Sequence, residues 1–136
     1  MICIISCSTP KQKEYEQIEK YFKKIHNFKI DKTINKIVVI TEGRTCGTCD
    51  RAFAKTVFKN LQNENTLFLV SATGNQVDIQ PFLNIEKNCF FDWELNVVEY
   101  PEFKSSRVIY LKDNAIDTIV ILNSMEIMQQ LEYFKK

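Results

Sequence analysis

The sequence predicts an α/β fold, in which buried strands alternate with amphipathic helices. Two apolar runs, Lys36–Thr41 and Thr66–Ser71, have the composition of central strands that are covered on both faces. Between them, apolar residues recur with helical spacing from Cys49 to Leu61. A strand, a helix and a second strand in this order most simply form a parallel crossover.

The remaining segments predict two more helices and a hairpin. Lys11 to His26 carries apolar residues at the i, i+3, i+4, i+7 spacing of an amphipathic helix. The stretch from 72 to 88 is irregular and has room for a short helix. Arg107–Leu111 and Ile116–Leu122 flank a polar turn, which predicts a hairpin, and Met125–Lys136 has the pattern of a last helix.

Length and composition fit one globular domain of ordinary type. The chain has 136 residues, of which 45% are hydrophobic and 26% charged, enough to bury a core and unlike a disordered chain. Eighteen basic residues balance seventeen acidic ones, so charge gives no reason to expect a nucleic-acid partner. No apolar run approaches the roughly 20 residues that span a bilayer.

The first seven residues have the pattern of the end of a secretion signal. Met1–Cys7 is apolar, and Ile4-Ile5-Ser6-Cys7 resembles the bacterial lipobox, whose cysteine becomes lipidated. The resemblance implies a lipid anchor at Cys7, on a cell-envelope protein that faces the periplasm. Because the apolar run is shorter than the ~7–15 residues of a signal core, a cytoplasmic domain with a short first strand stays open.

The pair in Cys46-Gly47-Thr48-Cys49 lies between the first predicted strand and the helix that follows. A cysteine at a helix N-terminus faces unpaired N–H groups and the positive end of the helix dipole, which lower its pKa below about 8.5. One helical turn brings Cys49 close enough to resolve a mixed disulfide formed at Cys46. Arg44 would favour the thiolate, whereas Asp50 would oppose it.

The order of elements and the Cys-Gly-Thr-Cys motif resemble the thioredoxin-like superfamily, most closely its membrane-tethered bacterial reductase-like members. The resemblance covers 35–136 and implies a central mixed sheet flanked by helices. Residues 8–34 would add an N-terminal helix and linker, and residues 1–7 would be the remnant of a lipoprotein signal. The family assigns Cys46 as the exposed nucleophile and Cys49 as the buried resolving thiol. It implies no cofactor, and a protein disulfide or dithiol as substrate or redox partner.

Three positions near the pair depart from the family pattern. Thr45 stands where a Trp usually precedes the first cysteine. Ile40 replaces the acidic proton acceptor of the preceding strand, for which Glu42 is the candidate substitute. Ser105-Ser106 occupies the place of the cis-proline that shapes the substrate groove. With Cys46 and Cys49 as the catalytic pair, we expect Arg44, Glu42, Thr45 and Ser106 to be supporting residues of the site.

Three functions follow from these patterns. The first is a thiol–disulfide oxidoreductase, a reductase or electron relay, tethered at Cys7. The second is a thioredoxin-fold binding or structural module whose Cys46–Cys49 pair is a structural disulfide. A metal carrier is the third, but no second cysteine pair or histidine pair has ligand spacing, so we expect no metal site.

Overall fold

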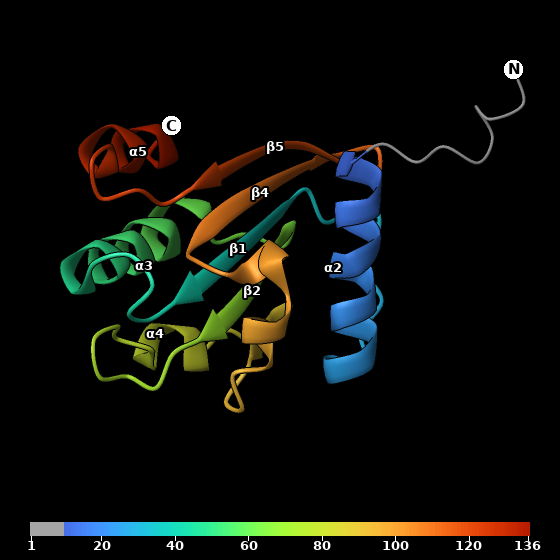
Figure 1. Cartoon of the computed structure of the whole chain (residues 1–136), viewed down its shortest axis with the longest axis horizontal. Coiled ribbons are helices and arrows are strands. Elements are labelled where there is room, and N and C mark those ends of the chain that lie inside the picture. Colours follow the sequence, from blue (N-terminus) through green and yellow to red (C-terminus); the bar gives the residue numbers. More distant parts are fainter. Residues whose placement is uncertain (1–9) are drawn as a thin grey trace, which may run out of the picture.

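The computed structural model describes residues 10–136 and has an α/β architecture (Figure 1). One five-stranded sheet forms its centre, with helices on both faces. In chain order the elements are α2 (Pro10–His26), β1 (Lys36–Thr41), α3 (Gly47–Leu61), β2 (Thr66–Ser71), α4 (Gln80–Leu83), β3 (Cys89–Phe91), the 3-10 helices η1 (Asn96–Glu99) and η2 (Pro101–Phe103), β4 (Arg107–Lys112), β5 (Ala115–Ile121) and α5 (Ile127–Phe134).

The strand order is β3-β2-β1-β4-β5, which makes the sheet mixed. β1 runs parallel to β2, and β2 parallel to β3, whereas β4 is antiparallel to both β1 and β5. The predicted parallel crossover and the predicted hairpin are therefore confirmed. The hairpin turns at Asp113 and Asn114, whose φ values of 54° and 61° lie in the left-handed region that Asp and Asn tolerate better than most residues.

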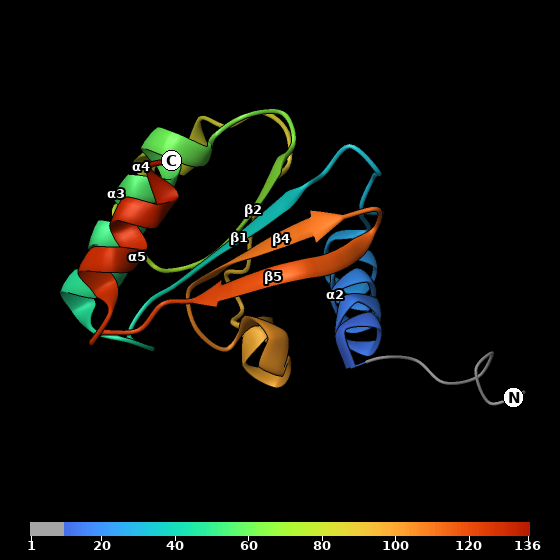
Figure 2. The ribbon, with the colours of Figure 1, turned by 90° about the horizontal axis from the view of Figure 1, so that it is seen from above.

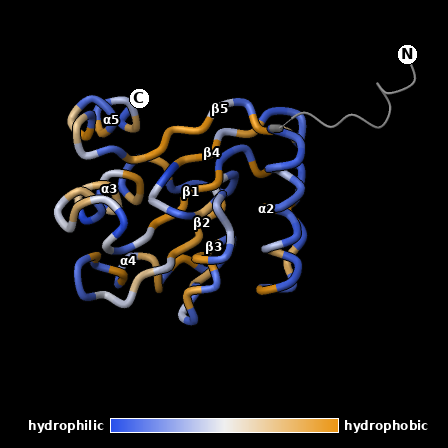
Figure 3. The backbone as a smooth tube through the Cα atoms, viewed as in Figure 1, coloured by the Kyte–Doolittle hydropathy of each residue, from blue (hydrophilic) through white to orange (hydrophobic). Residues whose placement is uncertain are grey.

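The two faces of the sheet bury different cores, because successive residues of a strand point to opposite faces. On β1, Ile37 and Val39 pack with α2, whereas Val38 and Ile40 pack with α3 and α5. Figures 1 and 2 show α2 on one side of the sheet and the pair α3 and α5 on the other. In Figure 3 the central strands are mostly hydrophobic, while the helices alternate between hydrophobic and hydrophilic residues, as amphipathic helices do.

The additional N-terminal helix is part of the main core. Its predicted apolar stripe is buried, and the side chains of Ile18, Tyr21 and Phe22 are completely inaccessible. Truncating a buried phenylalanine such as Phe22 to alanine costs about 3–5 kcal/mol of stability. α2 is therefore held to the sheet by packing.

Strand direction brings three loops to one edge of the sheet. β1, β2 and β3 are parallel and end at this edge, and β4 begins there because it runs antiparallel to β1. The residues after β1 (42–46), those after β2 (72–79) and those before β4 (104–106) consequently meet. The cysteine pair belongs to the first of these loops and to the start of α3.

The structure differs from the sequence prediction mainly in the middle of the chain. The predicted short helix is α4. β3 and the two 3-10 helices after it were not predicted, because the residues that form them show no clear periodicity. α5 is shorter than the segment Met125–Lys136 from which it was predicted. β3 has only three residues, too few to show a period in the sequence.

Candidate functional site

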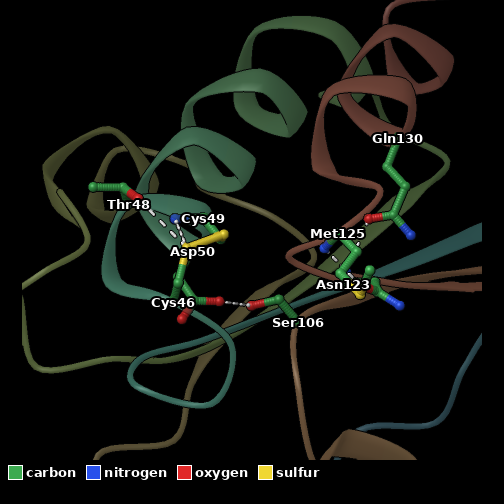
Figure 4. The surroundings of a disulfide bond; sticks show 8 residues. All are labelled: Cys46, Thr48, Cys49, Asp50, Ser106, Asn123, Met125 and Gln130. Atoms are coloured by element: carbon green, nitrogen blue, oxygen red, sulfur yellow. Dashed lines mark hydrogen bonds between the residues drawn. A yellow bond between two sulfur atoms is a disulfide. The ribbon is translucent and has the colours of Figure 1, made fainter.

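Cys46 and Cys49 form a disulfide at the start of α3, with their Cα atoms 4.9 Å apart (Figure 4). Cys46 is the N-cap of the helix and has an extended backbone. Its Sγ accepts a hydrogen bond from the Cys49 N–H at 2.9 Å and lies 3.4 Å from Thr48 Oγ1. The sulfur thus holds the position that the oxygen of a capping Ser or Asp usually occupies. After reduction, the same N–H and the helix dipole would stabilise a Cys46 thiolate.

The two sulfurs differ in access. Cys49 is 5% exposed and belongs to the core beneath α3, whereas Cys46 is only half-buried. An incoming thiol or disulfide can therefore reach Cys46 more readily than Cys49. The burial of Cys49 agrees with the resemblance, whereas Cys46 is half-buried and not fully exposed as the resemblance implied.

Asp50 is completely buried on the same helix, directly after Cys49. Its Oδ1 accepts a hydrogen bond from Ser106 Oγ at 2.9 Å, and its Oδ2 is a buried oxygen without a hydrogen-bond partner in residues 10–136. Burial raises the pKa of this carboxyl, and the Ser106 hydroxyl and nearby backbone N–H groups of the loop before Cys46 oppose the rise only in part. A buried carboxyl with an unmet hydrogen bond is costly for stability and is typical of a functional site.

Ser106 joins the cysteine loop to the sheet. It is completely buried, and its Oγ accepts from the Thr41 N–H at 3.0 Å as well as donating to Asp50. Figure 4 shows the Asp50–Ser106 hydrogen bond beside the disulfide. Residues 10–136 contain no cis peptide bond, so the peptide bonds of the Ser105-Ser106 segment are trans. This segment contacts the site through the hydroxyl of Ser106.

The carboxylate of Glu42 accepts hydrogen bonds from a different loop, the one after β2. Its Oε1 accepts from the Thr73 N–H at 2.7 Å and the Thr73 hydroxyl at 2.9 Å. Its Oε2 accepts from the N–H groups of Gly74, Gln76 and Val77 at 3.2, 2.9 and 2.8 Å. Burial opposes ionisation, but these bonds outweigh it and lower the pKa of Glu42 to about 2. Glu42 is therefore a poor proton acceptor at neutral pH, and the structure favours Asp50 over Glu42 as the acidic group of the site.

Arg44 and Thr45 lie in the loop between β1 and the disulfide. Arg44 is exposed and lines a shallow hollow with Lys104, Ser105 and other residues. Thr45 is half-buried, and its backbone N–H is one of those near Asp50. Stabilisation of a Cys46 thiolate by Arg44 stays a prediction, because the structure contains the disulfide.

Among the described residues, one further cysteine accompanies the pair. Cys89 is free, and burial raises the pKa of its thiol to about 12, so it is unreactive at neutral pH. Cys7, the predicted lipidation site, lies outside the residues that the structure describes, as does Cys3.

The described part of the chain lacks two further features. Between residues 10 and 136, no group of three or more His, Cys, Asp or Glu side chains is arranged to hold a metal ion. In the same range, no helix is both long enough and apolar enough to cross a membrane.

The importance of Asp50 is greater than the sequence suggested. The sequence showed it only as a charge that opposes the Cys46 thiolate. A signal was present, since Asp50 lies three residues before Phe53 and seven before Val57, on the apolar stripe of α3. A carboxylate on such a stripe is expected to be buried. The five hydrogen bonds of Glu42 had no comparable signal, because they depend on how the loop after β2 folds back.

Comparisons of this chain with protein-family models, with curated proteins and with solved structures return no match.

Proposed function

We propose that this chain is a thioredoxin-like thiol–disulfide oxidoreductase, acting as a reductase or electron relay through Cys46 and Cys49. The observation that carries the proposal is the arrangement of the pair at the start of α3. The accessible sulfur accepts a helix N–H at 2.9 Å, and the second sulfur is 5% exposed. The mixed five-stranded sheet with helices on both faces is compatible with the thioredoxin-like layout.

The proposed chemistry is two successive thiol–disulfide exchanges. In the reduced protein, the Cys46 thiolate attacks a substrate disulfide, forms a mixed disulfide and releases one substrate thiolate, which takes up a proton. Cys49 then loses its proton and attacks Cys46 Sγ, which closes the Cys46–Cys49 disulfide and releases the second substrate thiol. Two electrons and two protons reach the substrate, and an external dithiol must return the protein to its reduced form.

Asp50 is the group to which we assign the proton of Cys49. Its carboxyl is buried, follows Cys49 directly and has a raised pKa. These properties suit a group that can take up and release a proton in surroundings from which water is largely excluded. The hydroxyl of Ser106 orients the carboxyl through its bond to Oδ1.

Trapping of the mixed disulfide tests the proposal. Incubated with an oxidised model peptide, a reduced Cys49→Ser variant should accumulate a covalent adduct at Cys46, detected by mass spectrometry. Cys46→Ser should form none, and Cys89→Ser, a control at the half-buried free thiol, should turn over like the parent. Equal adduct formation at Cys46 and Cys89, or none at all, would contradict the proposal.

The alternative proposal is a binding or structural module in which the disulfide only stabilises the fold. The observation that favours it is Ser106 on a trans backbone in place of the family's cis-proline. The disulfide joins two residues that are three positions apart in the sequence. A cross-link across so short a loop stabilises a fold less than one across a long loop. If this alternative holds, Cys46→Ser lowers the melting temperature and leaves the biological role intact.

The lipid anchor at Cys7 and the cell-envelope location are part of the same proposal. They predict that the mature protein carries acyl chains on Cys7. Radiolabelled fatty acid should be incorporated into the full chain in a bacterial host and not into a Cys7→Ser variant. An unlabelled protein in the cytosolic fraction would support the cytoplasmic alternative.

A further inference from the structure

A shallow hollow of about 460 Å³ lies beside the cysteine loop, between the residues after β1 and the residues before β4. We call it the basic hollow, and its lining residues are Arg44, Pro101, Lys104, Ser105, Arg107 and Ile121. Half of these side chains are cationic and none is acidic. The hollow therefore favours a negatively charged ligand.

Arg107 is the most informative residue of the basic hollow. It is 6% exposed, and its guanidinium donates to the Ser105 carbonyl at 2.9 Å and the Ser105 hydroxyl at 3.2 Å. The only ion pair among the described residues joins Lys135 and Glu132, so Arg107 has no carboxylate within ion-pair distance there. Burial disfavours the charge of Arg107, and Glu14 and Glu102 favour it only from longer range. A buried guanidinium without a close carboxylate is costly, and a carboxylate ligand would relieve that cost.

Two exposed cations, Arg44 and Lys104, line the basic hollow together with Arg107. Arg44 is two residues before Cys46, and Lys104 precedes Ser105. Neither side chain makes an ion pair with a described residue. Ser106, the next residue after the Ser105 of the hollow, bonds to Asp50 beside the disulfide (Figure 4). A ligand that bound Arg107 and Arg44 in the hollow would thus contact a residue that lies two positions before Cys46 in the chain.

We infer that the basic hollow binds acidic side chains of a polypeptide whose disulfide Cys46 attacks. This inference rests on the proposed oxidoreductase function and adds a substrate class to it. The three cations come from two loops and the first residue of β4, so several carboxylates along a chain match them better than one small anion does. Guanidinium groups also bind carboxylates in a two-pronged geometry that an ammonium group does not offer.

Three disulfide peptides of equal length test the inference, with Glu, Gln or Lys flanking the same pair of cysteines. We expect the reduced protein to reduce the Glu peptide roughly tenfold faster than the Gln peptide at low salt, and the Lys peptide more slowly than either. At about 0.5 M salt the difference should shrink toward unity, because exposed charges are screened. Lys104→Glu should abolish the preference for the Glu peptide.

Lys112→Glu is the matched control, because it changes charge equally at the exposed far end of β4. It should keep the preference. Arg107→Lys retains the charge and removes the two-pronged donor, so it should reduce the preference in part even if Arg107→Gln fails to fold. An unchanged preference in Lys104→Glu would overturn the inference, as would equal loss in Lys104→Glu and Lys112→Glu.

Binding without chemistry separates this inference from the proposed function. A Glu peptide with both cysteines replaced by serine should bind the oxidised protein and shift the NMR signal of Arg107 Nε–H, and the Gln peptide should not. If no peptide is reduced but this shift occurs and is lost in Lys104→Glu, the basic hollow stands and the redox function fails. If the Gln and Glu peptides are reduced equally and no shift occurs, the redox function stands and the inference fails. A shift with free glutamate but none with the Glu peptide also contradicts a polypeptide ligand.

Discussion

Two carboxylates lie on either side of the Cys46–Cys49 pair in the chain, and their surroundings are opposite. Glu42, before the pair, accepts five hydrogen bonds from the segment Thr73–Val77, and its pKa falls to about 2 although burial opposes this. Asp50, after the pair, is completely buried, accepts one hydrogen bond from a side chain and keeps a buried oxygen without a partner among the described residues. Its pKa is raised, chiefly by burial.

This difference separates a structural carboxylate from one suited to chemistry. A carboxylate with all its acceptor sites occupied is fixed in its ionised form and stabilises the backbone that it binds. A buried carboxyl with unmet hydrogen bonds can exchange a proton, at a cost to stability. Both oxygens of the buried Asp92 have hydrogen-bond partners, since Oδ1 accepts from the N–H and side-chain amide of Asn96 and Oδ2 from the N–H of Val97. Among these three, Asp50 alone has the features of a reactive group.

The largest expected effect is on the rate of the second exchange. Asp50→Asn removes the proposed proton acceptor of Cys49, so the mixed disulfide should resolve about 100-fold more slowly. Stopped-flow measurement with a model disulfide gives this rate, and its pH dependence should lose one ionisation. Asp117→Asn, at an exposed position of β5, is the control and should leave the rate unchanged. A normal rate with an unchanged pH profile in Asp50→Asn would remove Asp50 from the mechanism.

The next effect is on stability. In Glu42→Gln an amide NH2 group, which is a hydrogen-bond donor, takes the place of a carboxylate oxygen that accepts bonds from backbone N–H groups. The free energy of unfolding at neutral pH should therefore fall by about 1–3 kcal/mol. Denaturant unfolding measures this loss. Hydrogen exchange should quicken at the amides of Gln76 and Val77, which donate to Glu42. Exchange unchanged at these amides would contradict the proposed role of Glu42 in the loop.

The two carboxylates should also give opposite pH dependences. The lowered pKa of Glu42 stabilises the fold above its ordinary value of 4.5, and this contribution is lost as the pH falls toward 2. The deficit of Glu42→Gln should therefore shrink on acidification.

The raised pKa of Asp50 favours the fold at low pH, so its contribution declines as the pH rises from 3.8 through the raised value. The stability of Asp50→Asn relative to the parent should consequently rise with pH across this interval, with a slope of about 1.4 kcal/mol per pH unit. Unfolding curves between acid and neutral pH measure both differences. A parallel trend in the two variants would show that the surroundings of the two groups are alike.

The smallest effect is expected at Ser106. Ser106→Ala removes the donor to Asp50 Oδ1 and the acceptor of the Thr41 N–H, at a cost of about 1–2 kcal/mol. Because the lost hydrogen bond lowered the pKa of Asp50, that pKa should rise further. An NMR titration of the Asp50 carboxyl carbon measures the change, and a fall in its pKa would contradict the assigned bond.

The sequence predicted the elements that depend on local periodicity and missed those that depend on tertiary contacts. β1 and β2 were predicted with their observed bounds, since continuous β-branched and apolar runs are typical of covered strands. β3 and the hydrogen bonds of Glu42 depend on segments distant in the chain, and no local pattern encodes them. At the site, the sequence placed Cys46 and Cys49 but treated Asp50 only as an opposing charge, because its burial becomes clear only when α3 packs on the sheet.

The most direct test of the central claim is the pKa of the Cys46 thiol in the reduced protein. The rate of alkylation at Cys46 as a function of pH gives this value, and Cys89, with its pKa raised to about 12, does not interfere. The N–H bond and helix dipole at Cys46 predict a pKa below the ordinary value of about 8.5, together with reduction of a model disulfide. A pKa at or above about 8.5, without any disulfide reduction, would contradict the claim and leave the pair as a structural disulfide.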